Sequence, residues 1–271
     1  MAAGAAGGGA WGSAMSAQEF AAVTGAGFDP VGQVLGTAVF HLGYTGNWCA
    51  GAWSPGRGTD VSSSRWAPFA DLVRAMYEAR RRALGRAVAE CRTLGADGVV
   101  GVRLRVGRFP SGGLEFTVLG TAVRARSAIR PARPFTSHLS GQDFARLLGG
   151  GWVPTGLAFG ISVASRHDDF RTVRQTRWRA GNQEVDGYTE LMTHARRDAR
   201  AQLARDAAAN GGDGVVVDEI DVRVGERECG QNSRDHIVEA VFVGTSVARF
   251  GRTATHTGPR PLTIMRLERE H

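Results

Sequence analysis

Metal coordination is the first chemistry that the reactive side chains of this chain suggest. Cys229 and His236 fall in one polar segment, and thiolate and imidazole are the ligands that zinc and other thiophilic metals prefer. Asp97 and Asp213 occupy matching turns, each followed by Gly-Val-Val, and their carboxylates add to the candidate set. We therefore name Cys229, His236, Asp97 and Asp213 as candidate ligands of a divalent metal ion.

The spacing of these residues weighs against a complete metal site within one chain. The sequence has no CxxC or HxxxH motif, which a structural zinc site usually shows. Other possible ligand groups are His41 with Cys49, and His167 with Asp168 and Asp169, and none recurs elsewhere in the chain. If the protein binds a metal ion, we expect the site to form at loops or between subunits.

The two repeated aspartates also have a structural interpretation. Aspartate often caps a turn by accepting hydrogen bonds from nearby backbone N–H groups, and Asp97 and Asp213 each lie between a helix pattern and a strand pattern. Both interpretations stay open at this point.

The sequence gives little support to an enzyme. Cys91 falls on the apolar stripe of a predicted helix, where a cysteine is usually a small core residue rather than a thiolate. No Ser, His and acid form a nucleophile elbow, and the triple glycine at 149–151 lacks the Lys-Ser/Thr of a phosphate loop. We predict a protein that is not an enzyme.

Composition narrows the class of partner and the compartment. The net charge is +7, but all 33 basic residues are arginine and they are dispersed among acidic residues, which argues against nucleic acid as a partner. Three cysteines without a repeated spacing do not indicate a disulfide framework. The first residues do not resemble a signal peptide, and no apolar run is long enough to span a membrane. A cytoplasmic protein is expected.

A duplicated segment must position all of these residues. Residues 16–39 recur at 140–163, 96–100 recur at 212–216, and 120–123 recur at 244–247. The differences in spacing fall between the matched blocks, as insertions in the loops of a common fold do. The chain is therefore predicted to contain two copies of one unit.

Each copy has the same predicted order of elements. A Ser with an acid three residues later starts a short capped helix, at Ser16 and at Ser140. A strand, a long amphipathic helix and two further strands follow. This order predicts the α+β class, with two tandem β-α-β-β units. In each unit one long helix packs on a three-stranded antiparallel sheet, and a short capped helix precedes it.

The predicted organisation follows from these boundaries. It comprises a disordered Ala/Gly-rich N-terminus at 1–15, one unit at 16–126, a linker at 127–139, a second unit at 140–250 and a tail at 251–271. Glycines at 32, 36, 156 and 160 lie inside strands, which predicts bulges or close approach of another backbone. Gly95 and Gly211 are expected to end the long helices with positive φ.

The second strand of each copy shows alternation. In the first copy we expect Val100, Val102, Leu104 and Val106 to point inward, with Arg103 and Arg105 outward. In the second copy Val216, Ile220 and Val222 are expected inward, with Glu219 and Asp221 outward. The opposite charges suggest that the outward face of one copy complements the outward face of the other.

At these residues the sequence resembles a known family. The run Leu-Gly-Ala-Asp-Gly-Val-Val-Gly at 94–101, with Gly-Thr-Ala-Val at 120–123, resembles the YbjQ family of heavy-metal-binding domains. The likeness covers roughly 31–125 and 155–249. It implies a β-α-β-β core that assembles into rings, typically pentamers in single-copy members. Arg103 and Arg105 replace a typically acidic strand edge, and Gly212 and Val217 also depart from the family's pattern.

Exposed aromatic residues with neighbouring arginines indicate an interface or a cover over a sheet. They are Trp48, Trp53 and Trp66 in the segment 45–70, and Phe170 and Trp178 in the second copy. Both interpretations stay open. The sequence as a whole predicts a non-enzymatic, ring-forming binding or scaffold protein that self-associates, as a pentamer or pseudo-decamer. The alternative is a heavy-metal-binding protein with sites at loops or subunit interfaces.

Overall fold

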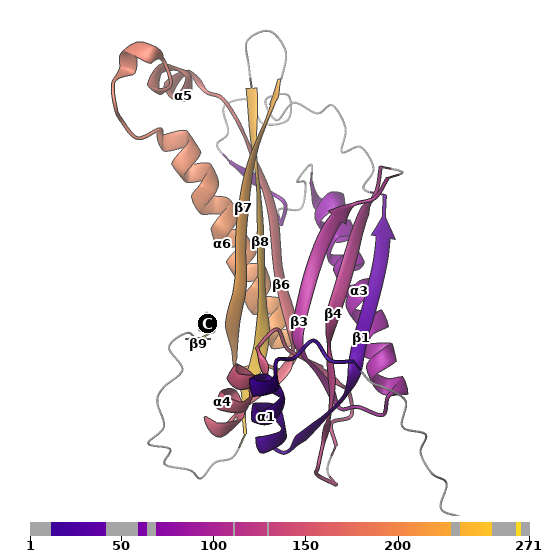
Figure 1. Ribbon diagram of the computed structural model, residues 1–271. Helices are drawn as coiled ribbons and strands as arrows, with labels where there is room; N and C mark the ends of the chain where they lie inside the picture. The colour runs from indigo at the N-terminus through magenta and orange to yellow at the C-terminus, as the bar shows by residue number, and fades with distance from the viewer. Residues whose placement is uncertain are drawn as a thin grey trace, which may run out of the picture.

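The computed structural model of the chain contains two β-sheets, each covered by one long helix (Figure 1). It describes residues 12–41, 59–63, 69–110, 112–128, 130–228 and 234–250, and the backbone of 264–266. The predicted α+β class with two tandem β-α-β-β units is confirmed. The predictions for residues 1–11, and those for Cys49, Trp48, Trp53 and Trp66, lie outside the described residues.

The two repeats contain matching elements in the same order. The first repeat has α1 (Ala17–Gly25), β1 (Phe28–Phe40), α3 (Ala70–Thr93), β3 (Gly98–Arg108) and β4 (Leu114–Ala125). The second repeat has α4 (Gly141–Gly149), β6 (Trp152–His167), α6 (Asp186–Ala209), β7 (Gly214–Glu228) and β8 (Arg234–Arg249). Short elements lie between and after them: β2 (Asp60–Val61), β5 (Phe135–Thr136), α5 (Phe170–Gln175), a 3-10 turn (Trp178–Ala180) and β9 (Ile264–Arg266).

Both sheets have an antiparallel core of three strands. The order is β1-β4-β3-β5 in the first sheet and β2-β6-β8-β7-β9 in the second, so the last strand of each repeat is central. Bulges occur at equivalent places, between Pro30 and Gly32 and between Pro154 and Gly156. The segment predicted as a C-terminal tail contributes a short strand, β9, which pairs with Gly214–Val216 of β7.

Two strand glycines let the long helices approach their sheets closely. A Cβ on Gly36 would lie 2.0 Å from the Ala83 carbonyl oxygen of α3, and a Cβ on Gly160 would lie 2.1 Å from that of Ala199 in α6. Both distances are far below van der Waals contact. The prediction that these glycines mark the approach of another backbone is confirmed, and the bulges account for Gly32 and Gly156.

The predicted helix ends are confirmed. Ser16 accepts a hydrogen bond from the Glu19 N–H, and the Glu19 carboxylate accepts one from the Ser16 N–H, which completes a capping box. The hydrogen bond from the Ser16 N–H contributes most to holding the pKa of the Glu19 carboxyl below its usual value, and the bond to the Ser16 side chain contributes less. Gly95 and Gly211 follow the long helices with φ of 66° and 78°.

The inward pattern of β3 and β7 was predicted incorrectly in part. A register shift between Val100 and Arg103 breaks the alternation, so Val99 and Val102 belong to one core cluster and Val100 to another. Val106 is exposed, although its register partner Phe116 is buried. In β7 an equivalent shift lies between Val217 and Glu219, and Ile220 is 58% exposed rather than inward. Alternation predicts side-chain direction only as long as the pairing register is unbroken.

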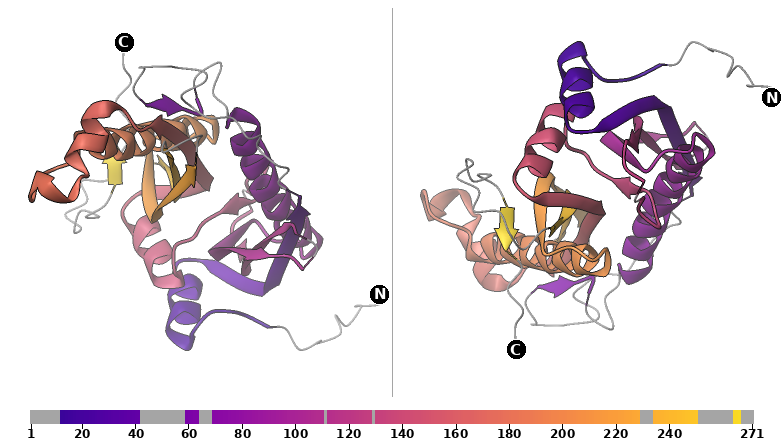
Figure 2. Two further views of the ribbon diagram at one scale, coloured as in Figure 1. Left: turned by 90° about the horizontal axis from the view of Figure 1, so that it is seen from above. Right: turned by 90° about the horizontal axis from the view of Figure 1, so that it is seen from below.

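The largest apolar core is shared by the two repeats. Ala83, Cys91 and their neighbours on α3 pack on the first sheet, while Phe159 and Ile161 of β6 join the same cluster from the second sheet. Helix α6 packs on the opposite face of the second sheet through Leu191 and Leu203. Helix α3 therefore packs mainly on the first sheet and also contacts β6 of the second repeat, and the two long helices lie at opposite sides of the molecule (Figures 1 and 2).

Helices α1 and α4 lie side by side at one end of the sheets (Figure 2). Gln142 donates a side-chain hydrogen bond of 3.2 Å to Gln18, its counterpart under the repeat. No helix in the described part of the chain combines the length and the apolar character needed to cross a membrane.

Candidate functional site

The structure places three of the four residues predicted as metal ligands, and it separates them. His236 lies near the start of β8, Asp97 precedes β3 and Asp213 precedes β7, while Cys229 lies outside the described residues. In the described ranges, no group of three or more His, Cys, Asp and Glu side chains is placed to hold a metal ion. Metal binding by this set stays a prediction.

Asp97 and Asp213 hold equivalent corners of the two sheets. A carboxylate oxygen of Asp97 accepts a hydrogen bond of 2.8 Å from the Ala125 N–H, and one of Asp213 accepts a bond of 3.0 Å from the Arg249 N–H. Each aspartate thus ties the turn after a long helix to the end of the central strand. This geometry is the structural interpretation that the sequence left open.

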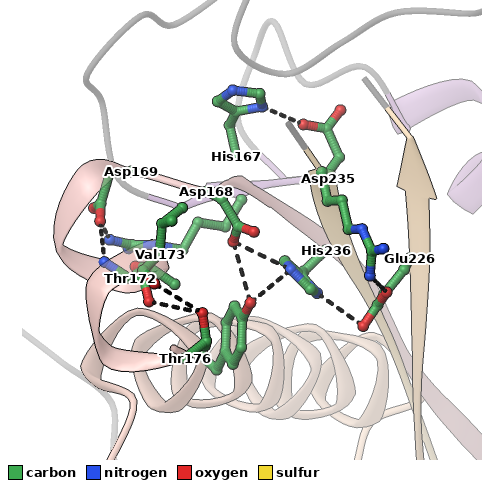
Figure 3. A network of polar contacts seen from close by, with 12 residues as sticks. His167, Asp168, Asp169, Thr172, Val173, Thr176, Glu226, Asp235 and His236 are labelled. Atoms are coloured by element: carbon green, nitrogen blue, oxygen red, sulfur yellow. Dashed lines mark hydrogen bonds and ion pairs between the residues drawn. The ribbon is translucent and has the colours of Figure 1, made fainter. Parts of the chain in front are cut away.

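His236 belongs to a buried polar network between α6 and the far end of the second sheet (Figure 3). Its Nε2 lies 2.8 Å from the Tyr188 hydroxyl and 3.1 Å from an Asp168 carboxylate oxygen, and the Tyr188 hydroxyl donates to the same oxygen at 3.3 Å. Its Nδ1 lies 3.8 Å from Glu226. Both ring nitrogens therefore face protein groups, and a metal ion bound to either would have to displace one.

The protonation of Tyr188 follows from this setting. Burial, with the nearby Asp168 carboxylate, raises the pKa of Tyr188 to about 12. The hydroxyl keeps its proton at neutral pH, so it serves as a hydrogen-bond donor and not as a base. The network fastens α6 to β8 and to the turn after β6.

A second group of ion pairs extends this network. His167 Nδ1 lies 2.7 Å from the buried Asp235 carboxylate, and Arg166 pairs with Asp169 at 2.8 Å and with Glu190 at 2.6 Å. Asp169 also caps α5 by accepting the Thr172 N–H at 2.7 Å, and that bond lowers the pKa of its carboxyl most. The group that sequence reasoning proposed as ligands, His167 with Asp168 and Asp169, is engaged in these pairs and in the His236 network.

An arm formed by α5 and the 3-10 turn extends away from both sheets (Figure 1). Trp178 on this arm is 95% exposed, and Phe170 is also exposed. Four arginines line a hollow beside it: Arg171, Arg174, Arg177 and Arg179. In the second repeat these aromatics do not cover the sheet, which leaves the interface interpretation.

The free edge of β6 is capped by side chains rather than by another long strand. The N–H groups of Phe159, Ile161 and Val163 donate to Asp206, Tyr77 and Ser62 at 2.9, 2.9 and 3.0 Å. The Tyr77 hydroxyl also donates to the Phe159 carbonyl at 3.2 Å, and burial raises the pKa of Tyr77 to about 12. The first repeat thus supplies hydrogen-bond partners that the second sheet needs.

The segment between the repeats fills the rest of this junction. Ser137 N–H donates to Val99 and Val102 N–H donates to the Ser137 carbonyl, both at 2.9 Å, so the segment extends the first sheet. His138 is largely buried here, with Nδ1 2.7 Å from the Thr245 hydroxyl, and burial lowers the pKa of His138. Sequence reasoning missed this role and expected a linker.

The opposite charges of β3 and β7 meet at the junction within one chain. A cavity of about 220 Å³ is lined by Arg103 and Arg105 on one side and by Asp218 and Glu219 on the other, with His138 at its edge. No salt bridge joins these arginines to these acids in the part of the chain that the structure describes. Of the two acids predicted to face outward, Glu219 lines this cavity, whereas Asp221 pairs with Arg223 at 2.8 Å.

A wider apolar groove of about 1390 Å³ lies beside α1 and α4. Phe28, Phe135, Phe144 and Leu148 contribute its apolar wall. Phe135 and Phe144 stack with ring centroids 5.6 Å apart, and Phe28 meets both edge-on. Arg126 and Arg133 add two charged side chains to its lining.

Comparison with known proteins gives the family. The model of the YbjQ family, described as "Putative heavy-metal-binding", matches residues 63–126. An encapsulin nanocompartment protein of Mycobacterium tuberculosis is 34% identical over 254 residues, which is 90% of this chain and 88% of that protein. A UPF0145 protein of Natronomonas pharaonis is 47% identical over 51 residues, or 19% of this chain and 49% of that protein. A UPF0145 protein of Thermosipho melanesiensis is 34% identical over 93 residues, or 34% of this chain and 78% of that protein.

The structure and these relatives agree with the resemblance seen in the sequence. The family match falls on the long helix and the two strands of the first repeat, and the second repeat has the same elements in the same order. The chain belongs to the YbjQ family, and it carries the family's unit as a tandem duplication.

Proposed function

We propose that this protein is a non-enzymatic scaffold that assembles from copies of itself. One observation carries the proposal: the outer face of β1 is exposed, although the equivalent face of β6 is buried inside the chain. Leu35 and Val39 are 47% and 48% exposed, whereas their counterparts Phe159 and Val163 are buried in the shared core. An apolar strand face that is covered in one repeat and bare in the other indicates a missing partner.

The relatives support the same proposal. The relative that matches along nearly the whole chain is named as a nanocompartment protein, and a compartment is built from many copies of its subunits. We also propose that the protein is cytoplasmic and that its two units comprise residues 16–126 and 140–250.

A closed ring is the form of assembly that we propose. Gln18 and Gln142 are equivalent residues and touch at 3.2 Å, and equivalent atoms come together only close to the axis that relates the two repeats. A rotation about such an axis, applied again to further copies, brings all α1 and α4 helices around one centre. The pentamer or pseudo-decamer expected from single-copy family members is the working stoichiometry.

Mass measurement tests the proposal. Light scattering after size exclusion is expected to give a multiple of the 28.8 kDa chain. The double variant Leu35→Glu/Val39→Glu places two charges on the exposed face and is expected to yield single chains. Phe109→Glu is the matched control, because Phe109 is exposed in the hairpin between β3 and β4 and is expected to leave the mass unchanged. Wild-type protein that stays a single chain at all concentrations contradicts the proposal.

Metal binding is the second proposal, and the description of the family model supports it. Cys229, His236, Asp97 and Asp213 remain the proposed ligands, and an interface between copies is the place where they could be completed. Elemental analysis of untagged protein tests this. Stoichiometric metal that is lost in Cys229→Ser and in His236→Gln supports the proposal, and assembled protein without bound metal contradicts it.

A further inference from the structure

The contact between the two repeats uses one surface of each repeat, and within a single chain the equivalent surface on the other side of each repeat has no partner repeat. At this junction the segment 135–139 pairs with β3 of the first repeat through backbone bonds, with Phe135 and Thr136 in parallel register with Gly98 and Val99. The same segment packs on its own repeat, where the Ser137 hydroxyl lies 3.4 Å from that of Thr245. It therefore bridges the sheet of one repeat and the sheet of the next.

The same segment exists ahead of the first repeat. The Ser13 hydroxyl lies 3.4 Å from that of Thr121, and it accepts the Met15 N–H at 3.1 Å. The second repeat has the matching bonds, from Ser137 to Thr245 and from the Leu139 N–H to Ser137 at 3.2 Å. Residues 12–15 are thus folded onto their own repeat in the way that 136–139 are folded onto theirs.

Only one of the two segments has a sheet edge beside it. Thr136, Ser137 and Leu139 are buried between the repeats, whereas Gly12 and Ala14 are exposed. The bonds that β3 makes to the later segment have no counterpart for residues 12–15 in the described part of the chain.

The complementary surface is present at the other end of the molecule. Residues 214–218 of β7 are the repeat counterparts of 98–102 of β3, which receive the bridging segment within the chain. Val100 is fully buried by that segment, while its counterpart Val216 is only half-buried. Further along β7, Ile220 and Val224 are 58% and 60% exposed.

The long helices carry a matching pair of charges. Within the chain, Arg81 of α3 pairs with Asp206 of α6 at 2.6 Å, and Asp206 also accepts the Phe159 N–H. The counterpart of Asp206 is Glu90, which accepts the Leu35 N–H at 2.8 Å in the same way. The counterpart of Arg81 is Arg197. Both Glu90 and Arg197 are exposed, and neither forms a salt bridge with a described residue.

We propose that the second repeat of one copy binds the first repeat of the next copy in the way that the two repeats bind within the chain. Residues 12–15 of the next copy extend the sheet at the β7 edge, and its Glu90 meets Arg197 of α6. The contact is head-to-tail, because the two surfaces lie on different repeats and each copy offers one of each. This inference rests on the proposed assembly and names its interface.

The β7 edge is not bare in the single chain. Strand β9 pairs antiparallel with Gly214–Val216, which is the stretch that the neighbouring segment would use in parallel orientation. A pairing of three residues forms few hydrogen bonds, and a short isolated strand adds little stability. Assembly therefore replaces β9 at this edge by residues 12–15 of the next copy.

Disulfide cross-linking tests the contact directly. Thr136 and Val99 are paired residues on neighbouring parallel strands at the junction, and Gly12 and Val215 are their counterparts. Gly12→Cys with Val215→Cys, with the three native cysteines replaced, is expected to give disulfides between copies upon mild oxidation. A Cβ on Gly12 meets nothing closer than 3.6 Å, so this position accepts the new side chain. Thr136→Cys with Val99→Cys is the matched control and is expected to close within one chain.

The outcomes separate the interface from the assembly itself. A ladder of covalent multimers for Gly12→Cys/Val215→Cys, with single chains for the control pair, supports the inference. Assembled protein, by light scattering, that forms no such ladder contradicts this interface and leaves the proposed scaffold standing. Single chains throughout contradict both. Failure of the control pair to close contradicts the template, and the inference with it.

A second cysteine pair tests the same contact if Val215→Cys prevents folding. Met15→Cys with Val217→Cys follows the junction bond between the Gly101 N–H and the Leu139 carbonyl, and Val217 lies outside the fully buried core. Circular dichroism identifies which pair is folded. A folded pair that assembles without cross-linking contradicts the inference.

Discussion

Replacement of Tyr77 by phenylalanine tests whether the first repeat holds the edge of the second sheet. The variant keeps the ring and removes only the hydroxyl, which accepts the Ile161 N–H at 2.9 Å and donates to the Phe159 carbonyl at 3.2 Å. Both backbone groups belong to the buried part of β6. An unsatisfied buried group costs about 1–3 kcal/mol, so we expect a loss of about 2–4 kcal/mol in the free energy of unfolding.

Chemical denaturation followed by circular dichroism measures this loss. The melting temperature is expected to fall by about 4–16 °C, because a loss of 1 kcal/mol lowers it by roughly 2–4 °C in a chain of this size. The matched control is Thr193→Val in the Leu35→Glu/Val39→Glu background, where single chains are expected: Thr193 is the counterpart of Tyr77 on α6, is exposed within the chain, and is expected to change stability by less than about 0.5 kcal/mol. A Tyr77→Phe variant as stable as the wild type would refute the assigned edge cap.

Three further predictions concern other parts of the fold. Gly160→Ala places a Cβ 2.1 Å from a helix carbonyl and is expected to destabilise the protein by about 3 kcal/mol, whereas Gly149→Ala, with open space around it, is not; urea midpoints compare the two. Burial lowers the pKa of His138 below its ordinary value of 6.5, so the unfolded chain binds a proton first as the pH falls. The stability that neutral His138 contributes is thus fully present above about pH 6.5 and is lost as the pH falls. Melting curves at pH 7.5 and 5.5 should show this loss in the wild type and not in His138→Gln. Burial raises the pKa of the Cys91 thiol to about 11, so in a variant without the other two cysteines, labelling by a thiol reagent at pH 8 should occur only after unfolding; labelling of folded protein would contradict the buried position.

The repeated elements could be predicted because their signals are local. Ser16 and Ser140 start capped helices, Gly95 and Gly211 end the long ones, and each signal depends on residues within one or two turns of the chain. Gly36 and Gly160 were also informative, because glycine in the middle of a strand is costly unless another backbone approaches.

The short strands could not be predicted, because two or three residues show no periodicity. Strands β2, β5 and β9 exist only through their pairing with a long strand of the other repeat or of their own. The bulge near Gly101 was likewise unexpected: it puts Val99 and Val102 in one core cluster and Val100 in another. Val106 and Ile220 are exposed, although their register partners Phe116 and Phe242 are buried.

The candidate site depended on contacts distant in sequence. His236 was identified by its type, but its partner Tyr188 lies on the long helix, where the sequence gives no sign of this contact. The sequence does contain one signal of the junction between the repeats. The matched pairs of the two repeats extend upstream to Ser13 and Ser137, which would have marked 127–139 as more than a linker.

Amide hydrogen exchange at low and high protein concentration tests the central claim most directly, because it reports on both halves of the proposed contact in unmodified protein. The account predicts that residues 12–15 and the β7 edge around Val217 gain protection together as the concentration rises, while the internal junction at 136–139 is protected throughout. Assembly without added protection at these two segments, or protection of only one of them, would contradict it.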